Sequence, residues 1–212
     1  MELSGNNLFS NVDFVFLDRD GVINRKARES EYVWQWSDFH PLPDVEAAIL
    51  SFNRSGRRVI VVTNQRGVAR GLYTLDQVDS LHDRLQKHLT RFGAHIDAFY
   101  VCTHDYLQCS CRKPKTGLLE QAFRDFPKAT KRNSIVIGDS VSDIQLALAF
   151  GIRSILIRDD ARILSPDDES TLSMATAVSS SLKQAVDTYF ITPANPVGTR
   201  RGLISIEAAR QR

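Results

Sequence analysis

The chain has 212 residues and a mass of 23.9 kDa, and 42% of its residues are hydrophobic and 25% are charged. These values are ordinary for a globular protein and fit one domain, predicted over residues 1–192, followed by a peripheral tail over 193–212. A net charge of +2 and the absence of an apolar run near the roughly 18 residues of a membrane span give no reason to expect nucleic acid or membrane partners.

The amino terminus lacks a basic leader followed by an apolar stretch, so no secretory signal is expected. The three cysteines are an odd number and argue against a disulfide framework. We therefore predict a cytoplasmic protein, and we expect it to be a monomer.

In chain order, short β-branched or aromatic runs bounded by turn residues alternate with segments whose apolar residues recur at helical spacing. The alternation predicts strands and helices in turn: strand 12–17, helix 45–55, strand 58–62, helix 74–93, strand 98–101, helix 118–126, strand 134–137, helix 142–150 and strand 154–157. This order indicates an α/β fold, a three-layer αβα Rossmann-like arrangement with helices on both faces of a parallel sheet. Ligands of such sheets bind at the carboxyl ends of the strands.

Acidic residues stand where the first and fourth strands end. Asp18 and Asp20 lie two positions apart after the first strand, and Asp139 and Asp143 follow the fourth. If these strands are neighbours, Asp18, Asp20 and Asp139 converge, and carboxylates that meet need a cation between them, for which Mg²⁺ is suited by its preference for oxygen. A lone aspartate at such a place is more often a turn or cap residue, but a set at successive strand ends favours a metal site.

Thr63 in "TNQ" and Lys113 in "RKP" complete a site suited to phosphate. A hydroxyl, backbone amides and a cation can bind the oxygens of a phosphoryl group during its transfer. Taken singly, Thr63 is as easily a strand-end cap, and Lys113 a solvated surface lysine.

The segments "DRDGVIN", "TNQ", "RKP" and "GDSVSD", in this order, resemble the four motifs of the haloacid dehalogenase (HAD) superfamily of phosphohydrolases. The resemblance implies that Asp18 is the nucleophile, which forms an aspartyl-phosphate, and that Asp20 is the general acid and base. It implies that Thr63 and Lys113 hold the phosphoryl group. It also implies that Asp18, the backbone carbonyl of Asp20, and Asp139 bind Mg²⁺ with support from Asp143.

All three cysteines lie within residues 102–111, together with a histidine. The pairs Cys102-x-His104 and Cys109-x-Cys111 provide the ligand set of a closed tetrahedral zinc site. Ordinary buried cysteines would not need to cluster, and C-x-C is a weak redox motif. We therefore predict a structural zinc that folds the loop and fixes Arg112 and Lys113 over the site.

A zinc loop ending in "CRKP" resembles one HAD subgroup, which contains the D-glycero-D-manno-heptose 1,7-bisphosphate 7-phosphatases and the histidinol-phosphate phosphatases. "TNQRGVARG" and "EYVWQWSDFHPLPDV" are similar to the heptose branch, whereas the short gap between His104 and Cys109 is nearer the histidinol-phosphate type. The heptose branch implies a small sugar bisphosphate as substrate, in the pathway to nucleotide-activated heptose and lipopolysaccharide precursors. It also implies substrate contacts from Asn64, Gln65, Arg70 and Arg112.

Three alternatives remain beside the heptose reading: a histidinol-phosphate phosphatase, a polynucleotide 3′-phosphatase, and an inactive phosphate- or metal-binding module. A polynucleotide enzyme would be expected to carry a basic groove, which the net charge does not support. A pure binder would not need both Asp18 and Asp20. The segment 25–31 is expected to be a solvated loop or a lining of the site entrance, and no insertion is long enough for a separate cap domain.

Overall fold

The computed structural model describes residues 8–28, 31–158, 169–170 and 173–190. Its strands are β1 (Phe14–Leu17), β2 (Arg58–Asn64), β3 (Ala98–Cys102), β4 (Ser134–Gly138), β5 (Arg153–Ile157) and β6 (Ala177–Ser179). Its helices are η1 (Trp36–Asp38, a 3-10 turn), α1 (Val45–Arg54), α2 (Leu75–Thr90), α3 (Gly117–Asp125), α4 (Val141–Phe150) and α6 (Leu182–Tyr189).

The six strands form one parallel sheet in the order β3-β2-β1-β4-β5-β6. The strand β1 lies between β2 and β4, with Leu17 in register with Val61 on one side and Ile137 on the other. The predicted neighbourhood of the first and fourth strands is therefore confirmed, and their carboxyl ends meet at one edge of the sheet.

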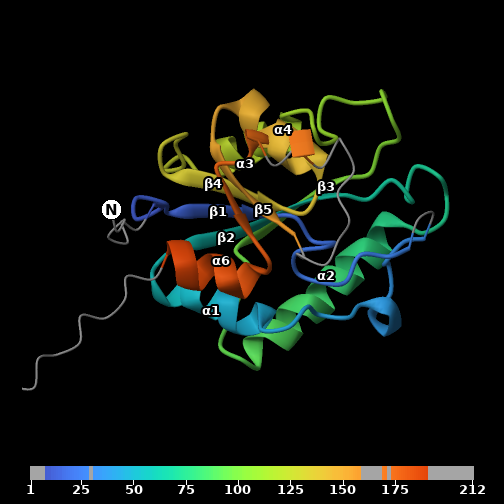
Figure 1. Cartoon of the computed structure of the whole chain (residues 1–212). Coiled ribbons are helices and arrows are strands. Elements are labelled where there is room, and N and C mark those ends of the chain that lie inside the picture. The colour runs from blue at the N-terminus through green and yellow to red at the C-terminus, as the bar shows by residue number, and fades with distance from the viewer. Residues whose placement is uncertain (1–7, 29–30, 159–168, 171–172, 191–212) are drawn as a thin grey trace, which may run out of the picture.

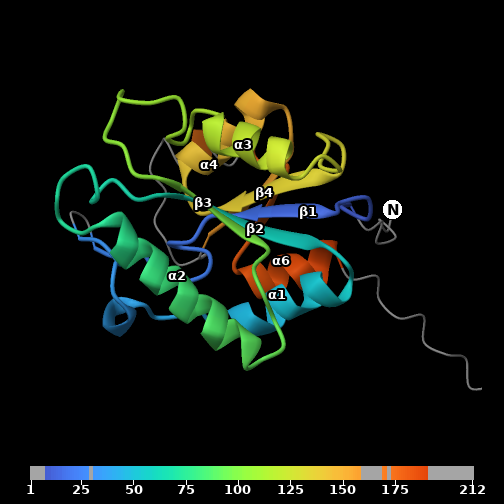
Figure 2. The ribbon, with the colours of Figure 1, turned by 180° about the vertical axis from the view of Figure 1, so that it is seen from behind.

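Helices cover both faces of the sheet, with α1, α2 and α6 on one side and α3 and α4 on the other (Figures 1 and 2). The strand β1 is buried throughout, and its successive side chains enter opposite cores. Val15 and Leu17 pack in the core under α1 and α6, and Phe14 and Phe16 pack in the core under α3 and α4. Burial on both faces explains why the strand sequences are continuously apolar.

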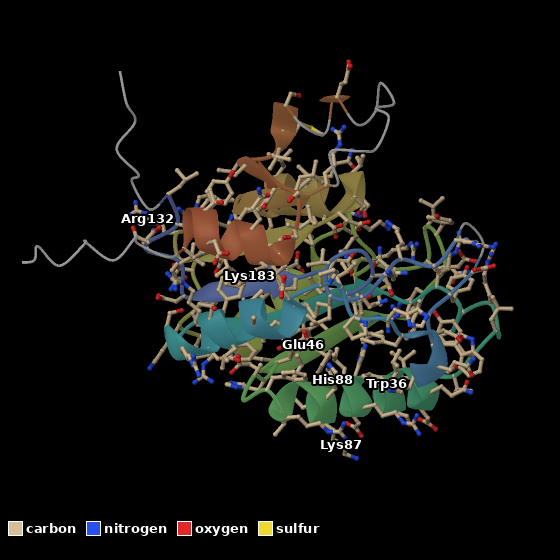
Figure 3. All side chains as sticks on the ribbon, turned by 60° about the horizontal axis from the view of Figure 1, so that its bottom comes forward. Trp36, Glu46, Lys87, His88, Arg132 and Lys183 are labelled. Atoms are coloured by element: carbon tan, nitrogen blue, oxygen red, sulfur yellow. The ribbon has the colours of Figure 1, made fainter. Side chains whose placement is uncertain are left out.

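The longest described helix, α2, begins at a capping box in which the Thr74 side chain accepts from the Gln77 backbone and the Gln77 side chain accepts from the Thr74 backbone. Near its other end, His88 Nε2 lies 2.6 Å from Glu46 Oε1 on α1, and the Trp36 ring lies over His88 at 5.6 Å between centroids. Figure 3 labels these three side chains at the contact between α2, α1 and the η1 segment. They hold α2 and the segment after β1 in fixed positions relative to α1.

Three elements of the described chain were not predicted from the sequence: the 3-10 turn η1, the edge strand β6 and the helix α6 that packs beside α1. The predicted tail, residues 193–212, lies outside the described residues. In the part of the chain that the structure describes, the segments after β1 and β2 contain η1 and turns but no further domain. No helix in this part has the length and hydrophobicity needed to cross a bilayer.

Candidate active site

The site lies at the carboxyl edge of the sheet, where the loops after β2 and β3 project at the right of Figure 1. A cleft of about 740 Å³ opens there between the ends of the strands and the segment after β1. Seven of the predicted site residues line it: Asp18, Asp20, Thr63, Asn64, Gln65, Arg112 and Lys113. Lys26, Ala27, Arg28 and Glu31 line it as well, so these residues of the predicted entrance segment border the cleft.

Lys113 is buried between two carboxylates at the centre of the site. Its Nζ lies 2.8 Å from Asp18 Oδ1 and 2.7 Å from Asp143 Oδ1, and it donates to the carbonyl of Val62 at 3.0 Å. The Arg19 backbone N–H also donates to Asp18 Oδ1. These contacts place one side of the Asp18 carboxylate in a fixed orientation at the end of β1.

The charges of this cluster are strongly coupled. Burial raises the pKa of Asp18 from 3.8 to about 7; Lys113 opposes this rise, and Asp143 and Asp139 add to it. For Lys113, burial acts to lower the pKa, but Asp143 and Asp18 outweigh it and raise the pKa above its ordinary value. The lysine is therefore charged, and it lies among carboxylates that repel each other.

Asp18, Asp139 and Asp143 can offer carboxylate oxygens that all lie within 4.8 Å of one another. Asp139 Oδ2 accepts from Lys26 Nζ at 2.8 Å, whereas Asp139 Oδ1 is buried without a hydrogen-bond partner. Gly21, at φ +93°, approaches this carboxyl group so closely that an added Cβ would lie 2.3 Å from its Cγ. An all-oxygen donor set with an unsatisfied buried oxygen fits a small hard cation such as Mg²⁺.

The Asp20 carboxylate is not part of this three-residue cluster, which differs from the predicted convergence of Asp18, Asp20 and Asp139. It accepts instead from Arg19 Nη2 (3.1 and 2.9 Å), Asn24 Nδ2 (2.8 Å) and Gln65 Nε2 (3.1 Å). These donors hold the Asp20 carboxylate at the wall of the cleft. The third carboxylate of the cluster comes from Asp143 on α4.

Thr63 and Gln65 form the wall at the end of β2, and both are buried. Gln65 Nε2 donates to Thr63 Oγ1 at 2.9 Å as well as to Asp20, while its Oε1 accepts from the Tyr73 hydroxyl at 2.9 Å. The amide of Gln65 thus links the predicted acid, the predicted phosphate-binding hydroxyl and a buried tyrosine.

Asn64 holds the basic segment that carries Lys113. Its Oδ1 accepts from the Lys113 backbone N–H at 3.0 Å, and its Nδ2 donates to the Lys113 carbonyl at 3.2 Å. The Lys113–Pro114 peptide bond is cis. Both polar ends of the Asn64 side chain are therefore used to fix the backbone of Lys113.

The two predicted substrate-binding arginines lie differently. Arg112 lines the cleft, whereas Arg70 is half-exposed next to it, within 3.4 Å of the Tyr32 hydroxyl and 3.7 Å of Asp105. Arg70 is not among the residues that line the cleft. It contacts Tyr32, which does line the cleft, and Asp105.

The cysteine cluster lies on the loop after β3. Cys102 Sγ is 3.7 Å from Cys109 Sγ and 3.3 Å from Cys111 Sγ, and His104 Nδ1 is 3.3 Å from Cys111 Sγ. All three cysteines are free, and one ligand atom from each of the four residues lies within 4.8 Å of the others. Tetrahedral Zn–S bonds of about 2.3 Å place sulfurs about 3.7 Å apart, so the four groups fit a zinc ion.

Sequence reasoning missed Arg19, Asn24 and Tyr73 as site residues, and it placed Lys26 only in a segment at the site entrance. Arg19 is fully buried and contacts His82 Nε2 at 3.4 Å and the Val33 carbonyl at 2.6 Å in addition to Asp20. A charged residue between two aspartates of a buried strand end was an available signal, since such a side chain needs a partner. The roles of Lys26 and Tyr73 depend on long-range contacts that no local pattern reveals.

Comparisons with known proteins agree with this geometry. A family model described as HAD-hydrolase-like matches residues 110–185. A D-glycero-alpha-D-manno-heptose-1,7-bisphosphate 7-phosphatase of Mycobacterium bovis is 43% identical over 63% of this chain and 70% of its own length. A D-glycero-beta-D-manno-heptose-1,7-bisphosphate 7-phosphatase of Vibrio cholerae is 35% identical over 80% of this chain and 91% of its own length.

Among solved structures, a D,D-heptose 1,7-bisphosphate phosphatase from B. bronchiseptica, complexed with magnesium and phosphate, superposes with a TM-score of 0.72. It is 26% identical and covers 83% of this chain and 97% of its own. A D,D-heptose 1,7-bisphosphate phosphatase from Burkholderia thailandensis, 28% identical, covers 82% of this chain and 97% of its own at a TM-score of 0.57.

Proposed function

Because this chain belongs to the family of the D-glycero-D-manno-heptose-1,7-bisphosphate 7-phosphatases, which are HAD-type hydrolases, we propose that it removes the 7-phosphate of that sugar bisphosphate. The observation that carries the proposal is the contact between Asp18 and Lys113 at the floor of the cleft, with Asp20 held beside it by Gln65 and Arg19. A nucleophile, an acid and a phosphate-binding cation are thus within reach of one phosphoryl group.

In the proposed reaction, one oxygen of the Asp18 carboxylate attacks phosphorus and the bond from phosphorus to the sugar oxygen breaks. Asp20 gives its proton to that departing oxygen. Water then attacks phosphorus of the aspartyl-phosphate and loses a proton to Asp20, which releases inorganic phosphate and restores the Asp18 carboxylate. Four hydrogen bonds from Arg19, Asn24 and Gln65 fix the direction of the Asp20 carboxyl group, so the same group serves both steps.

Thr63 and Lys113 are proposed to donate to the oxygens of the transferring group, where negative charge accumulates. We propose that Asp18, Asp139, Asp143 and the backbone carbonyl of Asp20 hold Mg²⁺, which supplies positive charge that offsets the repulsion between the carboxylate nucleophile and an anionic substrate. The structural support is the cluster of three carboxylates and the unsatisfied Asp139 oxygen.

The cysteine cluster is proposed to hold a structural zinc, because four ligands leave no open position for chemistry. The Arg112 backbone N–H donates to Cys109 Sγ at 3.3 Å, which ties the zinc loop to the segment of Arg112 and Lys113.

In the proposed substrate complex, Arg112 binds the phosphate that is not hydrolysed, and Asn64 and Gln65 serve mainly to position Lys113 and Asp20. Arg70 acts through Tyr32 and Asp105 at the cleft mouth. A cytoplasmic location and a monomeric state stay predictions.

A side-by-side assay tests the proposal. Purified protein with Mg²⁺ is given both anomers of heptose 1,7-bisphosphate, histidinol phosphate and a 3′-phosphorylated oligonucleotide, and phosphate release is measured. We expect the highest kcat/KM on a heptose bisphosphate and no release by Asp18→Asn. A far higher kcat/KM on histidinol phosphate or on the oligonucleotide would refute the substrate assignment, and full activity of Asp18→Asn would refute the mechanism.

A further inference from the structure

The short zinc loop carries an aromatic residue into the mouth of the cleft. Tyr106 lies between the two metal-binding pairs, in the four-residue stretch 105–108, and lines the cleft although its residue surface is 63% exposed. Two guanidinium groups lie over its ring: the Cζ of Arg66 is 4.4 Å and that of Arg112 is 4.6 Å from the ring centroid. An exposed tyrosine that contacts two cations in a substrate cleft calls for a functional explanation.

Arg66 is held on its other side by groups of the same loop and of the segment after β1. Its Nε lies 3.7 Å from Asp105 Oδ1, and its Nη2 lies 3.5 Å from the Tyr32 hydroxyl. Asp105, the residue before Tyr106, therefore contacts the same Arg66 guanidinium that lies over the Tyr106 ring. This arrangement fixes the plane of the Arg66 guanidinium at the cleft wall.

Arg112 has no carboxylate partner among the described residues, and its Nε and Nη1 are buried without a hydrogen-bond partner. A buried guanidinium with unused donors is costly unless an acceptor reaches it. The Tyr106 ring offers the electron-rich face of an aromatic system, which partly offsets the charge but accepts no strong hydrogen bond. The remaining donors are suited to an anionic group of a bound molecule.

We propose that Tyr106 is a positioning residue that holds Arg66 and Arg112 on the wall of the cleft, so that both bind the second phosphate of a bisphosphorylated sugar. Two guanidinium groups that contact one ring repel each other, and the electron-rich faces of the ring offset part of that repulsion. Arg66 thereby becomes a further specificity-determining residue. The inference rests on the proposed function, since it assigns the second anionic group of the same substrate.

The test compares Tyr106→Leu with two controls: Tyr106→Phe, which keeps the ring, and Leu107→Ala, which changes the neighbouring, 92% exposed side chain. KM and kcat are measured on heptose 1,7-bisphosphate and on heptose 7-phosphate, and zinc content is measured for each variant. For Tyr106→Leu we expect KM for the bisphosphate to rise about tenfold with kcat unchanged and KM for the monophosphate unaltered. Both controls should match the wild type.

The inference would be overturned if Tyr106→Leu affected both substrates equally or affected neither. It would also be overturned if Tyr106→Leu lost zinc, because Tyr106 would then serve loop folding. A second readout does not depend on the substrate: the ¹⁵N relaxation of the Nε–Hε groups of Arg66 and Arg112. We expect ordered signals in the wild type and in Tyr106→Phe, and fast motion in Tyr106→Leu.

The two proposals fail in different ways. A wild-type protein that does not hydrolyse the bisphosphate contradicts the proposed function, whereas the relaxation data decide on Tyr106 in either case. Unchanged arginine dynamics in Tyr106→Leu would overturn the positioning role even if the bisphosphate were the substrate.

Discussion

Arg19 is the largest fully buried side chain of the described residues, and it lies between the two aspartates of the first strand end. It donates to Asp20 and contacts His82, whose ring stacks on Phe99 at 4.3 Å between centroids. A buried cation is tolerated only with such partners. Because Arg19 donates its N–H, His82 Nε2 is assigned as the acceptor, which requires a neutral imidazole.

The neutral state of His82 predicts a pH-dependent stability. Burial, reinforced by Arg19 and opposed by Asp20, lowers the pKa of His82 from 6.5 to about 3. The unfolded state therefore binds a proton below pH 6.5 that the folded state does not, so stability is fully present above that pH and falls as the pH decreases toward 3. Through this single group, the free energy of unfolding should decrease by about 2 kcal/mol when the pH is lowered from 7 to 5.

The measurement is urea unfolding at both pH values for the wild type and for His82→Gln, which retains an acceptor for Arg19 but does not titrate. We expect a smaller decrease in the variant. Equal decreases in both proteins would show that His82 is not the group responsible.

At the residue scale, the sequence could predict Asp18, Asp139, Thr63 and Lys113 as one site. Asp18 and Asp139 directly follow predicted strands, and all four residues belong to motifs that occur in a fixed order along the chain. It could not predict the direction of the Asp20 carboxylate, since that depends on Asn24 and Gln65 from two other segments. Tyr106 was equally hidden: only the folded loop brings Arg66 and Arg112 to its ring.

At the scale of elements, the turn after β1 is the most constrained segment. Gly21→Ala would impose a side chain at φ +93° and place its Cβ against the Asp139 carboxyl group. We expect a stability loss of about 1–3 kcal/mol and a Mg²⁺ affinity reduced roughly tenfold or more, because the carboxylate that we propose to bind the metal must move. Gly56 is the matched control, since it has φ +79° but nothing within 4 Å of an added Cβ.

These effects are measured by denaturant unfolding and by calorimetric titration with Mg²⁺. Gly56→Ala should lose stability through strain alone and bind Mg²⁺ like the wild type. If Gly21→Ala bound Mg²⁺ equally well, the close approach to Asp139 would have no functional importance.

The zinc loop is a second element whose role can be isolated. Cys111→Ser should lose zinc and reduce kcat/KM by roughly 10- to 100-fold, since the segment of Arg112 and Lys113 loses its tie to Cys109. The sheet should stay folded. Lys113 should also stay attached to its carboxyl edge, because Asn64, Asp18 and Asp143 still contact it. Metal analysis, circular dichroism and kinetics provide the readouts, with Ser110→Ala as control. A zinc-free variant with full activity would contradict this role.

Most elements could be predicted because long apolar periodicity and clear stops coincide, as in α2, which follows the Thr74 cap and is followed by Gly93. The strand β6 could not, since three residues, Ala177–Ser179, carry too short a pattern. The helix α6 did carry a signal, a Ser181 cap before Leu182, Ala185 and Val186, but over only eight residues. Its packing beside α1 is a tertiary contact.

For the whole molecule, the proposed Mg²⁺ site at the carboxylate cluster predicts that metal binding is coupled to folding. Asp18, Asp139 and Asp143 repel each other in the folded state and separate on unfolding. Mg²⁺ at a hundred times its Kd should therefore raise the free energy of unfolding by about 2.7 kcal/mol. Thermal unfolding with and without Mg²⁺ checks this, and Asp139→Asn should abolish the increase. Asp187→Asn, on the surface of α6, is the control and should respond like the wild type. An increase retained in Asp139→Asn would place the ion elsewhere.

The most direct measurement concerns the covalent intermediate. The protein is mixed with Mg²⁺ and p-nitrophenyl phosphate, whose leaving group needs little acid assistance, then quenched, reduced with borohydride and analysed by peptide mass spectrometry. Reduction of an aspartyl-phosphate converts the carboxyl carbon to an alcohol. We predict homoserine at position 18 in the protein exposed to substrate and an unmodified Asp18 without it. Substrate turnover with an unmodified residue 18, or reduction at another aspartate, would contradict the assignment of Asp18 as the nucleophile.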